Sequence, residues 1–181
     1  IWNKGLLIMD NLEFIKSVEI EGNTTATSIT NCFNANFDIY QFVVRGQTSV
    51  DTSPAFYSMR LIDSGGSVIS DAEYDYANLY LKSNASYSEN EGTGETSWIE
   101  PLGETDASPE SAGAVVTIYN PYSSSSYTFA TFQSVFSVSG VTKGGKRAAV
   151  HKVAETITGI NIFRPSGSEL GAGTFTVYGV K

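Results

Sequence analysis

Apolar and polar residues alternate with a period of two through most of this chain. The clearest cases are LEFIKSVEI at 12–20 and TFTVYGV at 174–180. Side chains of a strand point alternately to the two faces of a sheet, so this period is typical of strands with one buried face. Glycine, proline, asparagine and serine separate the alternating segments and are typical of turns. The pattern therefore predicts an all-β protein with almost no α-helix.

The length and composition favour a single domain. The chain has 181 residues, of which 41% are hydrophobic and only 17% are charged. A chain of this length can bury roughly 70% of the surface that its unfolded form exposes. Helix-forming residues are sparse, whereas residues that favour strands and turns are frequent. We expect one antiparallel β-sandwich of jelly-roll type over 11–181, with about eight to ten strands, and an N-terminal arm over 1–10.

The last alternating segment predicts which of its residues reach the core. Phe175 and Val177 alternate with polar neighbours, so we expect both side chains to be buried. Gly179 falls on the same face, where a larger side chain would crowd a neighbour. We expect this strand to lie in the interior of a sheet.

Four other segments carry structural predictions. Segment 37–46 (FDIYQFVVRG) is apolar on both faces, which is typical of a central strand. Segment 84–113 is acidic and rich in glycine and serine, so we expect a long irregular loop. We expect Trp98 and Ile99 to pin the middle of this loop to the body as a short edge strand. In segment 12–20 the residues predicted to share one face are Leu12, Phe14, Val18 and Ile20. In segment 76–83 the residues predicted to point inward are Ala77, Leu79 and Leu81, and those predicted to point outward are Asn78 and Lys82.

The chain has few residues from which a catalytic site could be built. His151 is the only histidine and Cys32 the only cysteine. A Ser-His-Asp triad would have to use His151, which lies in a predicted strand. A zinc site of His and Cys ligands needs more than these two residues. We interpret Cys32 as a small buried apolar residue and His151 as structural or solvent-facing, and we expect no enzyme, metal or cofactor.

One group of carboxylates leaves three interpretations open. Asp71, Glu73 and Asp75 in DAEYDY follow a period of two, so they would project from one face of a strand. Such a group is most often a charged surface. It could also bind Ca²⁺, which takes oxygen ligands, or supply the acid and base of a glycoside hydrolase.

The chain is acidic, with a formal net charge of −8 and a pI of about 4.6. This argues against a nucleic-acid partner, since a phosphate backbone binds to basic surfaces. The one basic cluster, KGGKR at 143–147, is interpreted as a solvated hairpin loop. No run approaches the ~20 apolar residues of a membrane span, so we expect no membrane partner.

Three stretches carry motifs that follow one another in a characteristic order. LEFIKSVEI…ITNCFNANFDIYQFVV lies near the start and NPYSSSSYTFATF in the middle. The last stretch combines Ile157-x-Gly159-Ile160, a loop with Ser166-Gly167 and Gly173-Thr174, and a final Val177-Tyr178-Gly179-Val180. In this order the chain resembles a family of small jelly-roll virion proteins of tailed phages, notably phages of marine bacteria and cyanobacteria.

The resemblance implies a structural or adhesive protein of the virion, folded in bacterial cytoplasm and commonly trimeric, and it carries over no catalytic residue. We expect a capsid decoration or cement protein that binds the assembled head through the major capsid protein or another virion protein. The alternative is a tail-fibre or tip module that grips host surface polysaccharide with the segment 87–110. A glycan-degrading enzyme is a third hypothesis.

The residues expected at an interface are aromatic and apolar. The stretch IWNKGLLIM at 1–9 would be an exposed apolar patch in water, so we expect it to lie against a neighbouring subunit or the capsid. Two other interpretations of residues 1–8 are translated sequence upstream of a natural start at Met9 and the end of a longer or processed chain. The predicted interface residues are Trp2, Leu6, Leu7, Tyr87 and Trp98.

Overall fold

The computed structural model describes residues 11–48, 55–105, 111–165 and 167–181. Within these residues there are thirteen β-strands and no helix, hence no helix of the length and apolarity needed to cross a membrane. The strands form antiparallel sheets packed as a sandwich, so the prediction of an all-β sandwich is confirmed. Jelly-roll connectivity stays a prediction, and the predicted arm over 1–10 lies outside the described residues.

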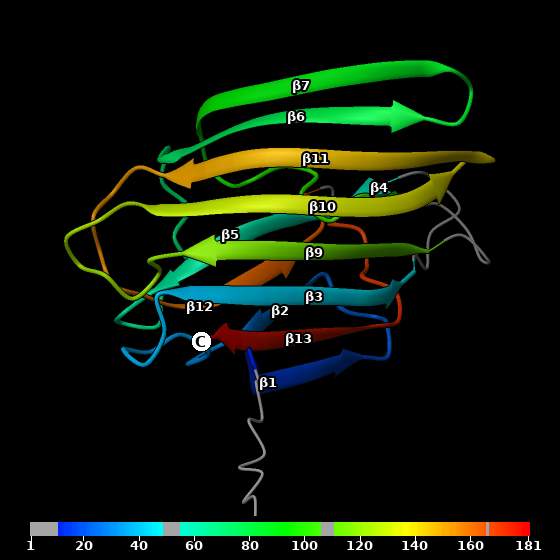
Figure 1. Ribbon diagram of the computed structural model, residues 1–181. Coiled ribbons are helices and arrows are strands. Elements are labelled where there is room, and N and C mark those ends of the chain that lie inside the picture. Colours follow the sequence, from blue (N-terminus) through cyan, green and yellow to red (C-terminus); the bar gives the residue numbers. More distant parts are fainter. Residues whose placement is uncertain (1–10, 49–54, 106–110, 166) are drawn as a thin grey trace, which may run out of the picture.

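The larger sheet has eight strands in the order β1-β13-β3-β9-β10-β11-β6-β7, and Figure 1 shows it in front of the other strands. Neighbouring strands are antiparallel throughout the sheet. In that order the strands span Leu12–Ile20, Gly173–Val180, Ile39–Gln47, Ala112–Tyr119, Thr128–Val138, Val141–His151, Tyr74–Lys82 and Ser86–Glu95.

The second layer is smaller. A three-stranded sheet in the order β2-β12-β5 lies behind the middle of the larger sheet (Figure 1), and β4 pairs with β8. The two layers enclose a core that draws residues from Ile20 to Val177. The strands of the second layer span Ala26–Ile29 (β2), Ala55–Phe56 (β4), Ser58–Asp63 (β5), Glu104–Thr105 (β8) and Ile157–Phe163 (β12).

Strand β13 lies in the interior of the larger sheet, between β1 and β3, as predicted. Phe175 and Val177 are fully buried, and the Phe175 ring packs against Phe42 with 5.7 Å between centroids. A Cβ placed on Gly179 would lie 2.6 Å from the ring of Phe37. Glycine at 179 therefore leaves room for an aromatic side chain of the core, as the sequence predicts. Segment 37–46 is likewise confirmed as a central strand, since β3 lies between β13 and β9.

The common face predicted for strand β1 is wrong for its first half. The pairing register shifts just after Phe14, which lies opposite Tyr178, whereas Val18 lies opposite Phe175. An extra residue in one strand moves the side chains beyond it to the other face. Phe14 is therefore 60% exposed and contacts Tyr178 edge to face, with 6.2 Å between the ring centroids.

The orientation predicted for strand β6 is also wrong. Tyr76, Asn78 and Tyr80 point inward and are buried. Two of these side chains have hydrogen-bond partners, because Asn78 Nδ2 donates to Asn90 Oδ1 at 3.0 Å and the Tyr80 hydroxyl donates to Glu100 Oε2 at 3.0 Å. Burying large tyrosine rings with satisfied polar groups outweighs burying leucines. The residues predicted to point inward, which are exposed instead, are Ala77, Leu79 and Leu81.

Two segments that the sequence predicts as loops are strands. Ser86–Glu95 forms β7, an edge strand whose polar residues on both faces give no alternation to detect. The basic cluster 143–147 lies inside β11, and the turn that precedes it is at residues 139–140, both with positive φ. Gly145 is needed for packing, since a Cβ there would lie 2.8 Å from the Tyr80 ring.

The burial of Phe175 predicts a large loss of stability on truncation. We expect Phe175→Ala to lower the free energy of unfolding by about 3–5 kcal/mol, because it removes a fully buried ring between β1 and β3. Thr174→Ala, its half-buried neighbour on the other face, should change it by less than about 0.5 kcal/mol. Urea denaturation of both variants measures the difference, and equal midpoints would contradict the assignment.

Candidate functional site

The outer face of the larger sheet carries a row of exposed apolar side chains. Val135 on β10 pairs with Gly144 on β11, Gly144 with Leu81 on β6, and Leu81 with Tyr87 on β7. Residues opposite each other on adjacent strands share a face and have Cβ atoms about 5 Å apart. Val135 is 58%, Leu81 64% and Tyr87 71% exposed. We call Val135, Gly144, Leu81 and Tyr87 the apolar row.

The neighbouring positions extend this surface across the sheet. Leu79, two residues before Leu81, is 44% exposed, and Val115 on β9 is 40% exposed. Gly144 has nothing within 4 Å of the position of a Cβ, so the row is open to solvent at its centre. A group of apolar side chains this exposed on one sheet face is typical of a surface that contacts another molecule.

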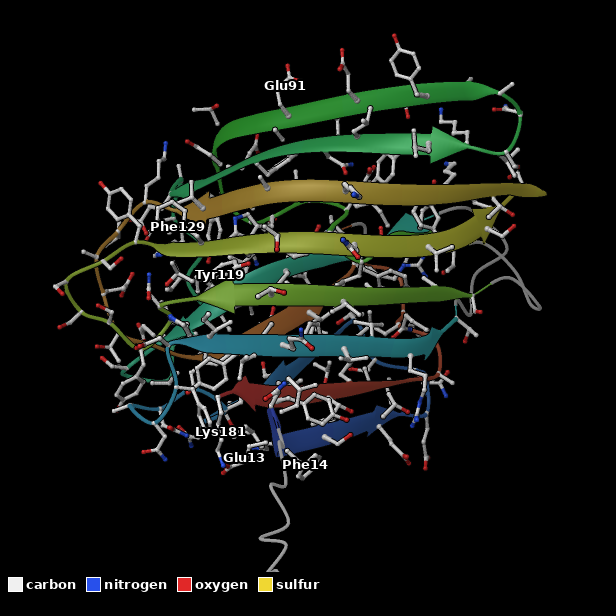
Figure 2. The ribbon with its side chains drawn as sticks, in the orientation of Figure 1. Glu13, Phe14, Glu91, Tyr119, Phe129 and Lys181 are labelled. Carbon is white, nitrogen blue, oxygen red and sulfur yellow. The ribbon has the colours of Figure 1, made fainter. Side chains whose placement is uncertain are left out.

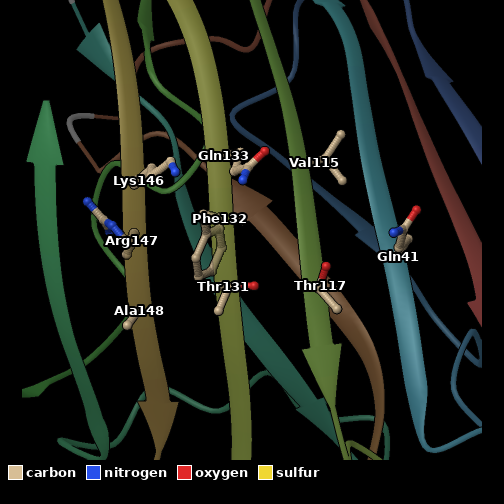
Figure 3. A pocket seen from close by; sticks show the side chains of 9 residues that line it. All are labelled: Gln41, Val115, Thr117, Thr131, Phe132, Gln133, Lys146, Arg147 and Ala148. Carbon is tan, nitrogen blue, oxygen red and sulfur yellow. The ribbon is translucent and has the colours of Figure 1, made fainter. Parts of the chain in front are cut away.

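An open depression lies on the same outer face, and Figure 3 shows the residues around it. Its volume is about 610 Å³. Amides, hydroxyls and an ammonium group line it, and these can donate and accept hydrogen bonds with a polar ligand. The aromatic pair Phe129 and Tyr119 lies on the same two central strands, β10 and β9 (Figure 2). The polar residues of the depression are Gln41, Thr117, Thr131, Gln133 and Lys146.

The predicted interface residues separate into three groups. Tyr87 is exposed in the apolar row, and its role as an interface residue stays a prediction. Trp98 is fully buried, so the prediction that it meets a partner is corrected: its side chain belongs to the core. Trp2, Leu6 and Leu7 lie outside the described residues.

Trp98 is buried because the segment after β7 crosses the inner face of the larger sheet. Its backbone N–H and carbonyl exchange hydrogen bonds of 3.0 Å with Met59, and its indole Nε1 donates to the Val150 carbonyl at 3.2 Å. Tyr74 and Phe132 meet its ring edge to face, with centroids 5.5 and 5.6 Å away. Trp98 therefore pins this segment to the body as predicted, but through a single bridge to Met59 and not through the short edge strand that the sequence predicts.

The carboxylates Asp71, Glu73 and Asp75 do not converge. Strand β6 begins only at Tyr74, so Asp71 and Glu73 precede it. Asp75 forms an ion pair of 2.8 Å with Lys152, and the hydrogen bond from Lys152 holds the pKa of Asp75 below its usual value. The prediction that the three share one strand face is therefore wrong.

Glu73 instead lies beside His151, the only histidine of the chain. His151 Nε2 lies 3.1 Å from Glu73 Oε2 and 3.7 Å from Glu155 Oε1. One ligand atom from each residue fits within 4.8 Å of the other two. His151 is fully buried, so of its two interpretations, structural or solvent-facing, the solvent-facing one is wrong. We call Glu73, His151 and Glu155 the histidine cluster.

The histidine cluster holds two carboxyl groups and one imidazole, so its acidic groups outnumber its one basic group. Burial raises the pKa of Glu155, and the negative charges of Glu73, Asp63 and Asp71 raise it further, whereas His151 lowers it. Sequence reasoning missed this cluster because residues 151 and 155 do not meet along a continuous strand. Strand β11 ends at His151, and Glu155 in the connection to β12 brings its Oε1 to 3.7 Å from His151 Nε2.

Cys32 is fully buried, as predicted. Its Sγ lies 3.3 Å from the Ile29 carbonyl oxygen as a hydrogen-bond donor. Burial raises the pKa of the thiol to about 12.

In comparisons with protein-family models, with curated proteins and with solved structures, no match to this chain was found.

The raised pKa of Cys32 predicts an unreactive thiol. The thiolate is the reactive form, and at pH 8 a thiol with a pKa near 12 stays protonated. We expect the folded protein to resist modification by iodoacetamide at pH 8, and the unfolded protein in guanidinium to react at once. Mass spectrometry of both samples measures this, and rapid alkylation of the folded protein would contradict the burial.

Proposed function

We propose that this protein is a structural component of a phage virion, which decorates the assembled head by binding the major capsid protein or another virion protein. The observation that carries the proposal is the apolar row on the outer face of the larger sheet. The ordered motifs that resemble small virion proteins of tailed phages supply the class of partner. This resemblance is an argument by analogy. The apolar row is the surface that we propose for the binding that the resemblance implies.

The composition of the row suits a protein partner. Interface cores are enriched in aromatic and apolar residues and depleted of charges. Leu81 and Tyr87 meet this description, and no charged residue lies between Val135 and Tyr87 in the row. Acidic residues at the next outward positions of β7, Glu89 and Glu91, are exposed and would form a charged rim. The row is thus an apolar centre with a polar margin, as in many specific interfaces.

The alternative is a tail-fibre or tip module that recognises host surface polysaccharide. The polar depression favours it, because sugar hydroxyls bind amide and hydroxyl groups such as those of Gln41, Thr131 and Gln133. This depression lies on β3, β9, β10 and β11, away from the segment 87–110 that the sequence suggests for such binding. The two functions therefore use different residues of one sheet face and can be separated by mutation.

The decoration role predicts that substitutions in the row weaken attachment. We expect Leu81→Thr, Tyr87→Thr and Val135→Thr together to weaken binding to particles stripped of this protein by about 30-fold or more, which is about 2 kcal/mol. Threonine keeps the strand propensity, so the fold should be unchanged. Leu12→Thr, a similarly exposed residue on β1, serves as the matched control and should bind normally.

The same variants distinguish the alternatives. If the row variant binds particles normally but Gln41→Ala with Gln133→Ala abolishes binding to host polysaccharide, the fibre-tip function is correct and decoration is not. Analytical ultracentrifugation adds the oligomeric state. A trimer that becomes monomeric only in the row variant would make the row a contact between copies of this chain, and would contradict its use for capsid binding.

A further inference from the structure

The histidine cluster contains ligands of two kinds, one imidazole nitrogen and two carboxylate oxygens. They come from three places in the chain. Glu73 precedes β6, His151 ends β11, and Glu155 lies in the connection from β11 to β12. From this juxtaposition we propose that Glu73, His151 and Glu155 bind a divalent transition-metal ion, with Zn²⁺ as the preferred ion, and that the ion fastens this connection to the larger sheet.

The distances suit such an ion. Zinc binds histidine nitrogen and carboxylate oxygen at about 2.0–2.2 Å, so two ligands at a tetrahedral angle are roughly 3.3–3.6 Å apart. His151 Nε2 lies 3.1 Å and 3.7 Å from the two carboxylate oxygens, on either side of that range. The widest separation in the cluster is under 4.8 Å. Glu73 and Glu155 are 29% and 32% exposed, so their side chains have room to close on an ion by rotating.

The surrounding backbone holds the ligands in place. His151 pairs with Tyr74, which puts Glu73 beside the histidine. The Lys152 N–H donates to the Glu73 carbonyl at 2.8 Å, and the Ile157 N–H donates to the Pro121 carbonyl at 2.7 Å. The chain that carries Glu155 is therefore fixed at both ends. A buried imidazole aimed at two carboxylates on such a frame is a partly preorganised site.

The nature of the ligands decides the class of ion. Imidazole is a ligand for zinc and other transition metals, whereas Ca²⁺ and Mg²⁺ prefer oxygen alone. Among the described residues, His151 Nδ1 has no hydrogen-bond partner. Metal-binding histidines usually donate this second N–H to an acceptor, and losing such a partner costs 10–100-fold in affinity. We therefore expect affinity weaker than that of a structural zinc site with a complete outer shell.

Thermal unfolding with added metal tests the site. Saturating Zn²⁺, at about 100 times its dissociation constant, should raise the Tm of the unaltered protein by about 5–10 °C. The same concentrations of Ca²⁺ and Mg²⁺ should leave it unchanged. Titration calorimetry should give one ion per chain, and bound Co²⁺ should show the visible absorption of a cobalt ion with nitrogen and oxygen ligands.

Two matched double variants make the result specific. Glu73→Gln with Glu155→Gln removes two ligands but keeps the side-chain shapes and the buried histidine, so it should fold and bind Zn²⁺ at least tenfold more weakly. Glu89→Gln with Glu91→Gln removes the same charge from exposed positions of β7 and should bind like the unaltered protein. No zinc-dependent Tm shift in the unaltered protein, or an equal shift in the first variant, would overturn the proposal.

Discussion

Trp98 fixes how the larger sheet is covered, and much of the fold depends on it. The three-stranded sheet lies behind only part of the eight-stranded sheet (Figure 1). The segment around Trp98 covers the inner face of β6, β10 and β11, where the indole contacts Tyr74 and Phe132. Glu100 in the same segment accepts a hydrogen bond from Tyr80, and Arg147 donates to the Ile99 carbonyl. These contacts give the inward face of β6 a set of partners that suit tyrosine rather than leucine.

The exposed apolar row is a consequence of the inward orientation of tyrosine and asparagine in β6. In a strand, every side chain that turns inward sends its neighbour outward. With Tyr76, Asn78 and Tyr80 bound inside, Leu79 and Leu81 must lie on the outer face. Leu81 there lies in one row with Gly144 and Val135 on one side and with Tyr87 of the edge strand on the other. The leucines of β6 are therefore exposed, and the apolar row that Leu81 helps to form is the surface that we propose binds a virion partner.

The sequence could predict the parts of the fold that depend on one strand at a time. The burial of Phe175 and Val177 and the crowded position of Gly179 follow from local alternation. The central place of β3 follows from the apolar residues on both of its faces. The face of β6 depends on Trp98 and Glu100, which lie about twenty residues further along in a segment without regular pattern. The bulge in β1 and the polar strand β7 leave no period to detect. The histidine cluster depends on where β11 ends, which spacing along the chain does not show.

We propose that the outer face of β6, β10 and β11 attaches this chain to a virion protein. A density map of intact particles that carry this chain tests it directly, because the sandwich can be placed in the map by its unequal sheets. Our account predicts that density of a neighbouring capsid or virion protein covers Val135, Leu81 and Tyr87. A map in which this face points to solvent while another face contacts the particle would contradict it.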